Sequence, residues 1–179
     1  MKEYAEAFEA LSRLLVYPSG DHDERLGRCS KAIAALNDIP AEIAKKIQEF
    51  AIATRNLTTA QLEELYTRTF DINPISSLEV GWHLYGETYE RGAFLVSMRS
   101  LLYRLHIEES TELPDHLSHV LQALARMDPL EGSSFISTNV LKALDKMIAG
   151  FSEDSSPYEN ILSALKELLS HYASSYAGV

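Results

Sequence analysis

Three side chains that could do chemistry lie close together between positions 115 and 119. Asp115 and His116 are adjacent, and His119 follows three residues later. Carboxylate and imidazole groups bind zinc and transfer protons, so this cluster could activate a water molecule on a metal. The plainer interpretation is a helix start, because Pro114 suits a first helical turn and the helix dipole favours a carboxylate there. In both cases we expect solvent or a ligand to reach the Pro114–His116 turn.

Other catalytic patterns are weak. The chain has no Glu followed three residues later by His, the pair that a carboxylate-bridged di-metal bundle repeats. Cys29 is the only cysteine and lies on the apolar face of a predicted helix, which indicates a small buried side chain. Gly81, Gly86 and Gly92 lack the strand–turn–helix context of a phosphate loop. We expect no enzyme activity, no metal and no cofactor; a metal-dependent helical hydrolase using Asp115, His116 and His119 stays the alternative.

Charge and composition restrict the partners. The chain has 179 residues, with 26 acidic and 16 basic side chains and a formal net charge of −10. This balance opposes nucleic acid and anionic membranes, because both are bound through their phosphates. It attracts basic segments. No apolar run approaches the roughly 20 residues of a membrane span, so we expect no stable membrane insertion. A single cysteine and an N-terminus unlike a signal peptide indicate a cytoplasmic protein.

Apolar residues recur with helical spacing through most of the chain. The sequence therefore predicts an all-α, single-domain bundle of about eight helices over residues 1–179. The expected helices cover 4–15, 23–36, 40–51, 58–70, 88–105, 117–124, 136–148 and 157–172, with a short helix or bend at 76–85. Thr58 with Gln61 and Ser76 with Glu79 have the spacing of capping boxes. We expect the 88–105 helix to be the central one.

Aromatic and acidic residues alternate in one part of the chain. The rings belong to Tyr66, Phe70, Trp82, Tyr85 and Tyr89, and the interleaved acids are Asp71, Glu79, Glu87 and Glu90. Most of these rings could simply fill the core, and that is the favoured interpretation for the first two. Rings with an apolar body and a polar tip also suit a groove for an amphipathic helix, with acids at its rim. This pattern of rings and acids predicts a binding site for a basic peptide.

Three ordered motifs resemble one protein family. They are Leu65-Tyr66-Thr67-Arg68-Thr69-Phe70-Asp71, then His83-Leu84-Tyr85-Gly86-Glu87 with Arg91-Gly92, then Glu112-Leu113-Pro114-Asp115-His116-Leu117. Between about Thr58 and Met127 the chain resembles the NarJ-type assembly chaperones of respiratory nitrate reductase, which belong to the TorD/DmsD group of redox-enzyme maturation chaperones. The adjacency of Pro114 to the Asp-His pair favours the NarJ branch within that group.

The resemblance implies a TorD/DmsD-like, all-helical chaperone. Such a protein binds the N-terminal leader of a molybdoenzyme catalytic subunit and holds that subunit until molybdenum cofactor and iron–sulfur clusters are inserted. The oligomeric state stays open between a monomer and a domain-swapped dimer, because loops such as residues 128–134 permit domain swapping. A structural adaptor between folded proteins stays a second alternative. Carried over by motif position, the peptide-binding residues are Tyr66, Phe70, Pro114, Asp115 and His116, with Trp82, Tyr85 and Glu87 as further candidates.

Overall fold

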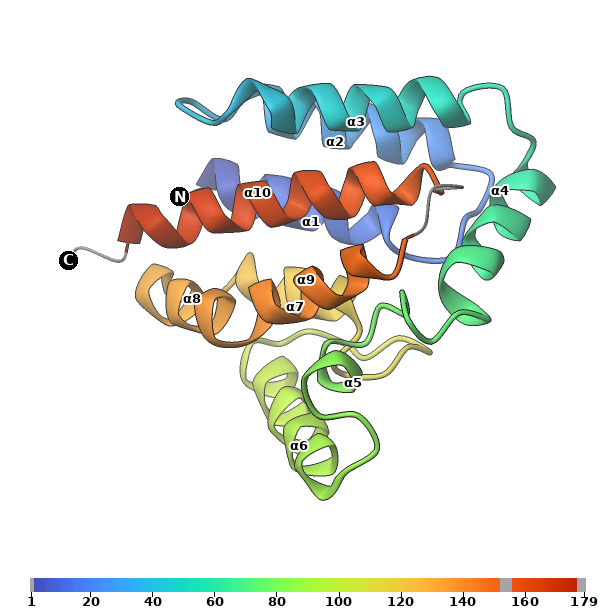
Figure 1. Cartoon of the computed structure of the whole chain (residues 1–179). Coiled ribbons are helices and arrows are strands. Elements are labelled where there is room, and N and C mark those ends of the chain that lie inside the picture. Colours follow the sequence, from blue (N-terminus) through green and yellow to red (C-terminus); the bar gives the residue numbers. More distant parts are fainter. Residues whose placement is uncertain (1, 152–155, 177–179) are drawn as a thin grey trace.

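The computed structural model describes residues 2–151 and 156–176, and within these ranges the fold is all-helical (Figure 1). The helices are α1 (Lys2–Leu14), α2 (His22–Ala34), α3 (Ala41–Thr54), α4 (Thr59–Tyr66), α5 (Val80–Tyr85), α6 (Tyr89–Arg104), α7 (Leu117–Leu124), α8 (Pro129–Phe135), α9 (Leu141–Ala149) and α10 (Tyr158–Tyr176). Two π-helical turns, η1 (Thr67–Asp71) and η2 (Ile136–Val140), extend α4 and join α8 to α9. The all-α prediction is confirmed.

Side-chain caps define several helix starts. Thr58 Oγ1 accepts a hydrogen bond from the Gln61 N–H at 3.3 Å, and Gln61 Oε1 accepts one from the Thr58 N–H at 2.9 Å. This is the reciprocal capping box that the sequence predicts. Asp128 caps α8 by accepting from the Leu130 N–H at 3.0 Å, with Pro129 in the first turn. The sequence predicts the first of these starts, whereas α8 is not among the expected helices although its capping residues are local in sequence.

The core lies between layers of antiparallel and crossing helices. In Figure 1, α10 and α1 lie between α2 and α3 on one side and α7, α8 and α9 on the other. Tyr158 at the start of α10 is buried among three rings, with centroid separations of 5.1 Å to Phe50, 5.8 Å to Tyr66 and 4.9 Å to Phe70. Such edge-on contacts join α10 to α3, α4 and η1. No helix among the described residues is long and apolar enough to cross a membrane.

The expectation that the 88–105 helix is central is wrong. This helix, α6, projects from the lower side of the body in Figure 1, and its fully buried residues are Met98 and Leu102. The central position belongs to α10, which buries nine of its residues and packs against α3, α8 and α9. The α6 sequence has apolar residues on nearly all sides, so its composition does not distinguish the face toward the core from the face toward solvent.

Replacing Phe50 by Ala tests the aromatic core. Phe50 is buried against Tyr158 and His22, so we expect Phe50→Ala to lower the free energy of unfolding by about 3 to 5 kcal/mol. The matched control is Ile52→Ala on the same helix, where the side chain is 55% exposed and the loss should stay under about 0.5 kcal/mol. Chemical denaturation measures both; equal losses would contradict this arrangement of the core.

Candidate peptide-binding site

Two segments distant in sequence meet through backbone hydrogen bonds next to α5 and α7. Glu79 and His116 form an isolated antiparallel bridge. The Val80 N–H donates to the Asp115 carbonyl at 3.0 Å, and the Leu117 N–H donates to the Leu78 carbonyl at 2.8 Å. The first residues of the two helices are thereby fixed to each other. We call this contact between residues 78–80 and 115–117 the 79/116 bridge.

Asp115 is an interior residue that caps α5. Its side chain is 0% exposed, and its Oδ2 accepts a hydrogen bond from the Gly81 N–H at 2.8 Å. A Cβ at Gly81 would lie 2.7 Å from this oxygen and 2.8 Å from Cδ1 of Phe94, so glycine is required for the close approach. Burial raises the pKa of the Asp115 carboxyl, against the opposing effects of the Gly81 hydrogen bond and Arg91. The expectation that solvent reaches Asp115 and Pro114 is therefore wrong, because both residues are buried; their part in peptide binding stays a prediction.

His116 caps α7 and also faces a cavity. Its Nδ1 accepts a hydrogen bond from the Ser118 N–H at 3.2 Å. An amide can only donate, so Nδ1 carries no proton and the neutral ring holds its proton on Nε2. Burial lowers the pKa of His116 to about 3, with a smaller effect from His119. The ring is thus a neutral hydrogen-bond donor throughout the physiological pH range.

His119 holds the preceding loop in place. Its Nε2 accepts from the Ser110 N–H at 3.1 Å, which places the proton on Nδ1, and Nδ1 donates to the Leu113 carbonyl at 2.9 Å. Both ring nitrogens are engaged, so neither offers a free lone pair to a metal. In the part of the chain that the structure describes, no three His, Cys, Asp or Glu residues gather as a metal site would require. This geometry does not support the alternative of a hydrolase built on Asp115, His116 and His119.

A cavity of about 380 Å³ lies beside the 79/116 bridge. Rings from α4, η1 and α5 form its apolar walls, and three carboxylates, one guanidinium and one imidazole supply its polar groups. It is lined by Tyr66, Phe70, Asp71, Pro74, Ser77, Leu78, Glu79, Trp82, Arg91, Glu112 and His116. We call it the aromatic–acidic pocket.

The carboxylates of the pocket repel one another. Partial burial raises the pKa of Asp71 and of Glu112, and the charge of Glu79 raises both further. Asp71 adds to the effect on Glu112, so the three acids share one region of negative potential. Arg91 is the cation in the lining, and its guanidinium lies 5.3 Å from the centre of the Trp82 ring. A positively charged ligand would relieve the repulsion among the acids.

The loop between η1 and α5 forms one wall and is well tethered. The Trp82 Nε1–H donates to the Pro74 carbonyl at 2.9 Å, and Ser76 Oγ donates to the Thr69 carbonyl at 2.5 Å. The His83 Nε2–H donates to the Ser77 carbonyl at 2.7 Å. These bonds satisfy backbone groups that would otherwise depend on water. The wall is therefore preorganised before any ligand binds.

The predicted site residues separate into two groups. Tyr66, Phe70, Trp82 and His116 line the aromatic–acidic pocket. The other four lie elsewhere: Tyr85 packs on Phe94 with centroids 5.5 Å apart, Glu87 lines a neighbouring hollow, and Pro114 and Asp115 are buried. Tyr66 and Phe70 also satisfy the interpretation that they fill the core, since both are buried and pack edge-to-face against Tyr158.

Sequence reasoning missed several lining residues. Glu112 and Arg91 lie inside the quoted motifs, but nothing in their spacing placed them opposite Trp82. Arg91 also lines the neighbouring hollow of about 450 Å³, together with Glu87, Thr88, Tyr89, Gly92, Leu95 and Leu113. The two hollows are therefore adjacent at Arg91. Charge is the sequence feature that could have indicated these lining residues, because acids precede or follow every aromatic segment of this region.

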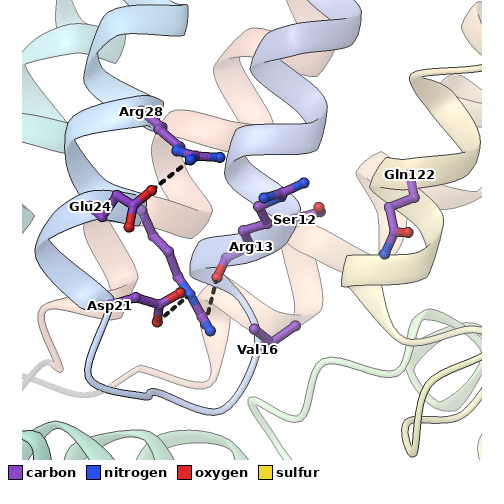
Figure 2. Close-up of a pocket in the computed structure, with 8 residues that line it drawn as sticks. Ser12, Arg13, Val16, Asp21, Glu24, Arg28 and Gln122 are labelled. Carbon is purple, nitrogen blue, oxygen red and sulfur yellow. Dashed lines mark hydrogen bonds and ion pairs between the residues drawn. The ribbon is translucent and has the colours of Figure 1, made fainter.

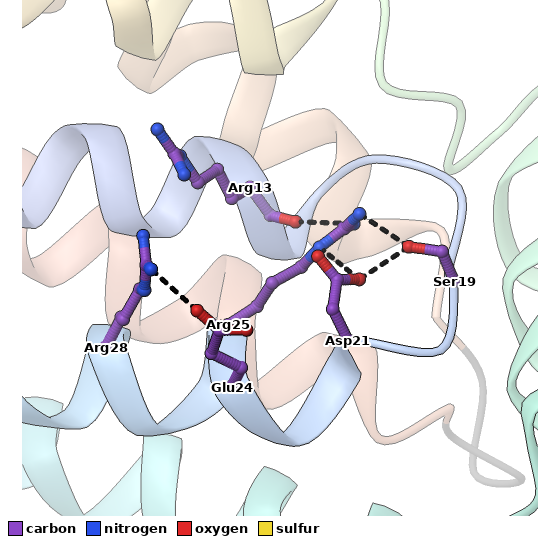
Figure 3. Close-up of polar contacts among 6 residues, drawn as sticks. All are labelled: Arg13, Ser19, Asp21, Glu24, Arg25 and Arg28. Carbon is purple, nitrogen blue, oxygen red and sulfur yellow. Dashed lines mark hydrogen bonds and ion pairs between the residues drawn. The ribbon is translucent and has the colours of Figure 1, made fainter.

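A further hollow of about 320 Å³ lies among α1, α2 and α7 and contains none of the predicted site residues (Figure 2). Two of the three arginines that line it, Arg25 and Arg28, have side-chain partners. In Figure 3, the Arg25 side chain holds the turn before α2 in place. Its guanidinium donates hydrogen bonds to the Arg13 carbonyl at 3.2 Å and to Ser19 Oγ at 2.6 Å, and it forms an ion pair with Asp21 at 2.8 Å. Arg28 pairs with Glu24 at 2.6 Å. We interpret this hollow as a consequence of how the α1–α2 turn is held.

Comparison with known proteins agrees with the motifs. A family model described as nitrate reductase delta subunit matches residues 36–179. The chain belongs to the nitrate reductase delta subunit family. The matched part of this delta-family chain includes α3 to α10 and every residue of the aromatic–acidic pocket.

The delta-family chain is also similar to curated proteins. It is 32% identical over 125 residues to the nitrate reductase molybdenum cofactor assembly chaperone NarJ of Escherichia coli (strain K12), and equally to the protein of that name in Escherichia coli O157:H7. The match covers 68% of this chain and 52% of each relative, so the chain spans about half the length of these relatives. The predicted resemblance to NarJ-type chaperones is confirmed.

Substitutions of Asp115 test whether its side chain caps α5 or contacts a ligand. Asp115→Ala leaves the buried Gly81 N–H without its acceptor, so we expect a loss of about 1 to 3 kcal/mol in unfolding free energy. Asp115→Asn keeps an acceptor oxygen and should stay within about 1 kcal/mol of the wild type. Denaturation of both variants at neutral pH checks this; an Ala variant as stable as the wild type would rule out the cap.

The stability difference between the wild type and Asp115→Asn should depend on pH in a known direction. The folded pKa of Asp115 is raised above its ordinary value of 3.8, so the folded state binds this proton more tightly than the unfolded state does. The contribution of Asp115 to stability therefore falls as the pH rises from that value through the folded pKa, and is constant above it. Because Asn does not titrate, Asp115→Asn should gain stability relative to the wild type over this interval.

Proposed function

We propose that this chain is a cytoplasmic assembly chaperone for a nitrate reductase-like molybdoenzyme, and that it binds the N-terminal leader of the catalytic subunit. The observation that carries the proposal is the aromatic–acidic pocket, in which three carboxylates surround three rings. Family membership and the names of the E. coli relatives support the client class. The leader is held until the molybdenum cofactor and iron–sulfur clusters are in place.

The pocket chemistry suits a basic, amphipathic segment. Trp82 offers partly exposed apolar surface to an aliphatic or aromatic side chain, whereas Tyr66 and Phe70 line the pocket with only 2% and 4% of their surface exposed. Asp71, Glu79 and Glu112 would meet lysine or arginine side chains on the same segment. The net charge of −10 would also favour encounter with a cationic leader over an acidic one. The combination selects for alternating apolar and basic positions.

The size of the hollows indicates how much of the leader they hold. A volume of about 380 Å³ is at the small end of ligand pockets and admits anchoring side chains rather than a whole helix. The neighbouring hollow of about 450 Å³ continues past Arg91 and would take the next helical turn. A leader helix would then lie across the surface, with residues on one face inserted in both hollows.

His116 supplies a specific polar contact. The Trp82 N–H is engaged by Pro74, whereas the His116 proton lies on Nε2 at the pocket wall. We infer that Nε2–H donates to a carbonyl or side-chain oxygen of the leader. Since a disordered leader must fold to bind, about 2 to 5 kcal/mol of the interaction is spent on ordering it. Moderate affinity follows, which suits a chaperone that must release its client.

Removing pocket charges should weaken leader binding. Glu79→Gln with Glu112→Gln removes two carboxylates without changing shape, and we expect about a tenfold loss of affinity, smaller at high salt. The control is Glu3→Gln with Glu49→Gln, two exposed acids of α1 and α3 that give the same net charge. Calorimetric titration with a synthetic nitrate reductase leader and its scrambled sequence measures both. Equal affinities for the two double variants would contradict the pocket as the binding site.

His116→Asn separates the ring donor from the cap. Asn is a good N-cap, so we expect the melting temperature to change little while leader affinity falls about fivefold through loss of the Nε2 donor. Because the pKa of His116 is about 3, its charge is constant and the ring should add no pH dependence between about pH 6 and pH 8. A wild-type affinity that changes over this range, and becomes flat in His116→Asn, would contradict the buried neutral ring.

A further inference from the structure

Helix α6 carries an exposed apolar stripe that the proposed peptide site does not use along most of its length. Tyr89, Val96 and Tyr103 follow one another at intervals of seven residues and are 97%, 65% and 84% exposed. Gly92, Ala93 and Ser100 lie between them and are also exposed. The buried residues Met98 and Leu102 lie on the opposite side of the helix. We call the six exposed residues the α6 stripe.

The α6 stripe is symmetric about its centre. Tyr89 lies seven residues before Val96 and Tyr103 lies seven residues after it. Gly92 and Ser100 are likewise four residues before and after Val96. Running the helix in the opposite direction therefore gives nearly the same order of large, small, branched, small and large side chains. Such a surface is complementary to a second copy of itself about a two-fold axis.

We propose that α6 is a self-association surface, on which two copies of this chain pair their α6 helices antiparallel with Val96 at the two-fold axis. Tyr89 of each copy then packs beside Tyr103 of the other. Small residues at positions 92, 93 and 100 let the helices approach closely. The seven-residue spacing is that of a helix pair with knobs-into-holes packing.

Charge at the two ends of α6 supports the antiparallel order. Glu87 and Glu90 lie at the N-terminal end, and Arg99 and Arg104 lie toward the C-terminal end. Antiparallel pairing brings the acids of one copy toward the arginines of the other and opposes the two helix dipoles. Arg99 and Arg104 already pair with Glu109 and Glu131. These ion pairs are exposed, so exchanging them costs little.

The geometry sets the strength of the dimer. Because α6 projects from the body in Figure 1, two copies can approach along this helix. Its 16 residues extend about 24 Å. A pair of helices of this length buries less surface than the roughly 1,600 Å² of a standard interface. The dimer is therefore weak and concentration-dependent. Tyr89 and Gly92 also line the hollow next to Arg91, so pairing covers that hollow and leaves the aromatic–acidic pocket open.

Sedimentation velocity over a range of concentrations tests the pairing. The mass of the full chain should rise from one copy toward two, and Val96→Glu should weaken the association at least about tenfold, because the two carboxylates would meet at the axis. Ile52→Glu on α3, another exposed aliphatic position, is the control and should dimerise like the wild type. A chain that stays monomeric, or two variants that behave alike, would overturn the proposal.

Disulfide trapping tests the direction of pairing. The native Cys29 is buried and its pKa is raised to about 12, so it does not compete. Val96→Cys should cross-link to a covalent dimer under mild oxidation, whereas Ile52→Cys should not. In mixtures, Tyr89→Cys should cross-link with Tyr103→Cys more than either does with itself. Preferred self-pairing of Tyr89→Cys would overturn the antiparallel arrangement. A monomeric protein whose leader affinity is lost in Val96→Glu would instead assign the stripe to the leader.

Discussion

The 79/116 bridge is the contact on which the site depends. Glu79 and His116, which are 37 residues apart in sequence, meet there, and Asp115 Oδ2 completes the first turn of α5 through the Gly81 N–H. A short helix such as α5 has little stability alone, because its first amides lack partners and few residues propagate it. The buried carboxylate supplies one of those partners. It thereby helps to hold α5 next to the start of α7, where Glu79, Trp82, Glu112 and His116 line the same pocket.

Burying the Asp115 carboxyl has a free-energy cost in the folded state. Desolvation raises its pKa, and its Oδ1 has no hydrogen-bond partner among the described residues. Arg91 partly offsets this through its charge while lying over Trp82. The guanidinium therefore links the interior carboxylate to the pocket surface. A ligand that moved Arg91 would change the electrostatic potential at Asp115.

The two apolar faces of α6 do different things. One face, with Met98 and Leu102, packs on the body. Leu102 also forms a small second core with Ile107 and Ala123. The other face is the α6 stripe. Exposed aromatic residues on a projecting helix are costly for solubility unless they have a use, and their order along the helix is what distinguishes self-pairing from general stickiness. The aromatic–acidic pocket shares no residue with the α6 stripe, whereas Tyr89 and Gly92 of the stripe line the neighbouring hollow. Self-pairing would therefore leave the aromatic–acidic pocket open and compete with the leader for the neighbouring hollow.

The sequence by itself determined the helices and the charge of the site. Helical periodicity and the cap at Thr58 depend on residues within one turn, and alternating rings and acids predict a basic peptide, whereas α8 with its cap at Asp128 is not among the expected helices. Only the tertiary structure decided which polar residues are buried. Asp115 looked accessible because its partner, the Gly81 amide, is remote in sequence. For the same reason the Ser76–Glu79 spacing predicts a local cap that α5 lacks, and the apolar residues of α6 predict a central position that belongs to α10. Burial depends on what packs against a residue, and local spacing does not contain that information.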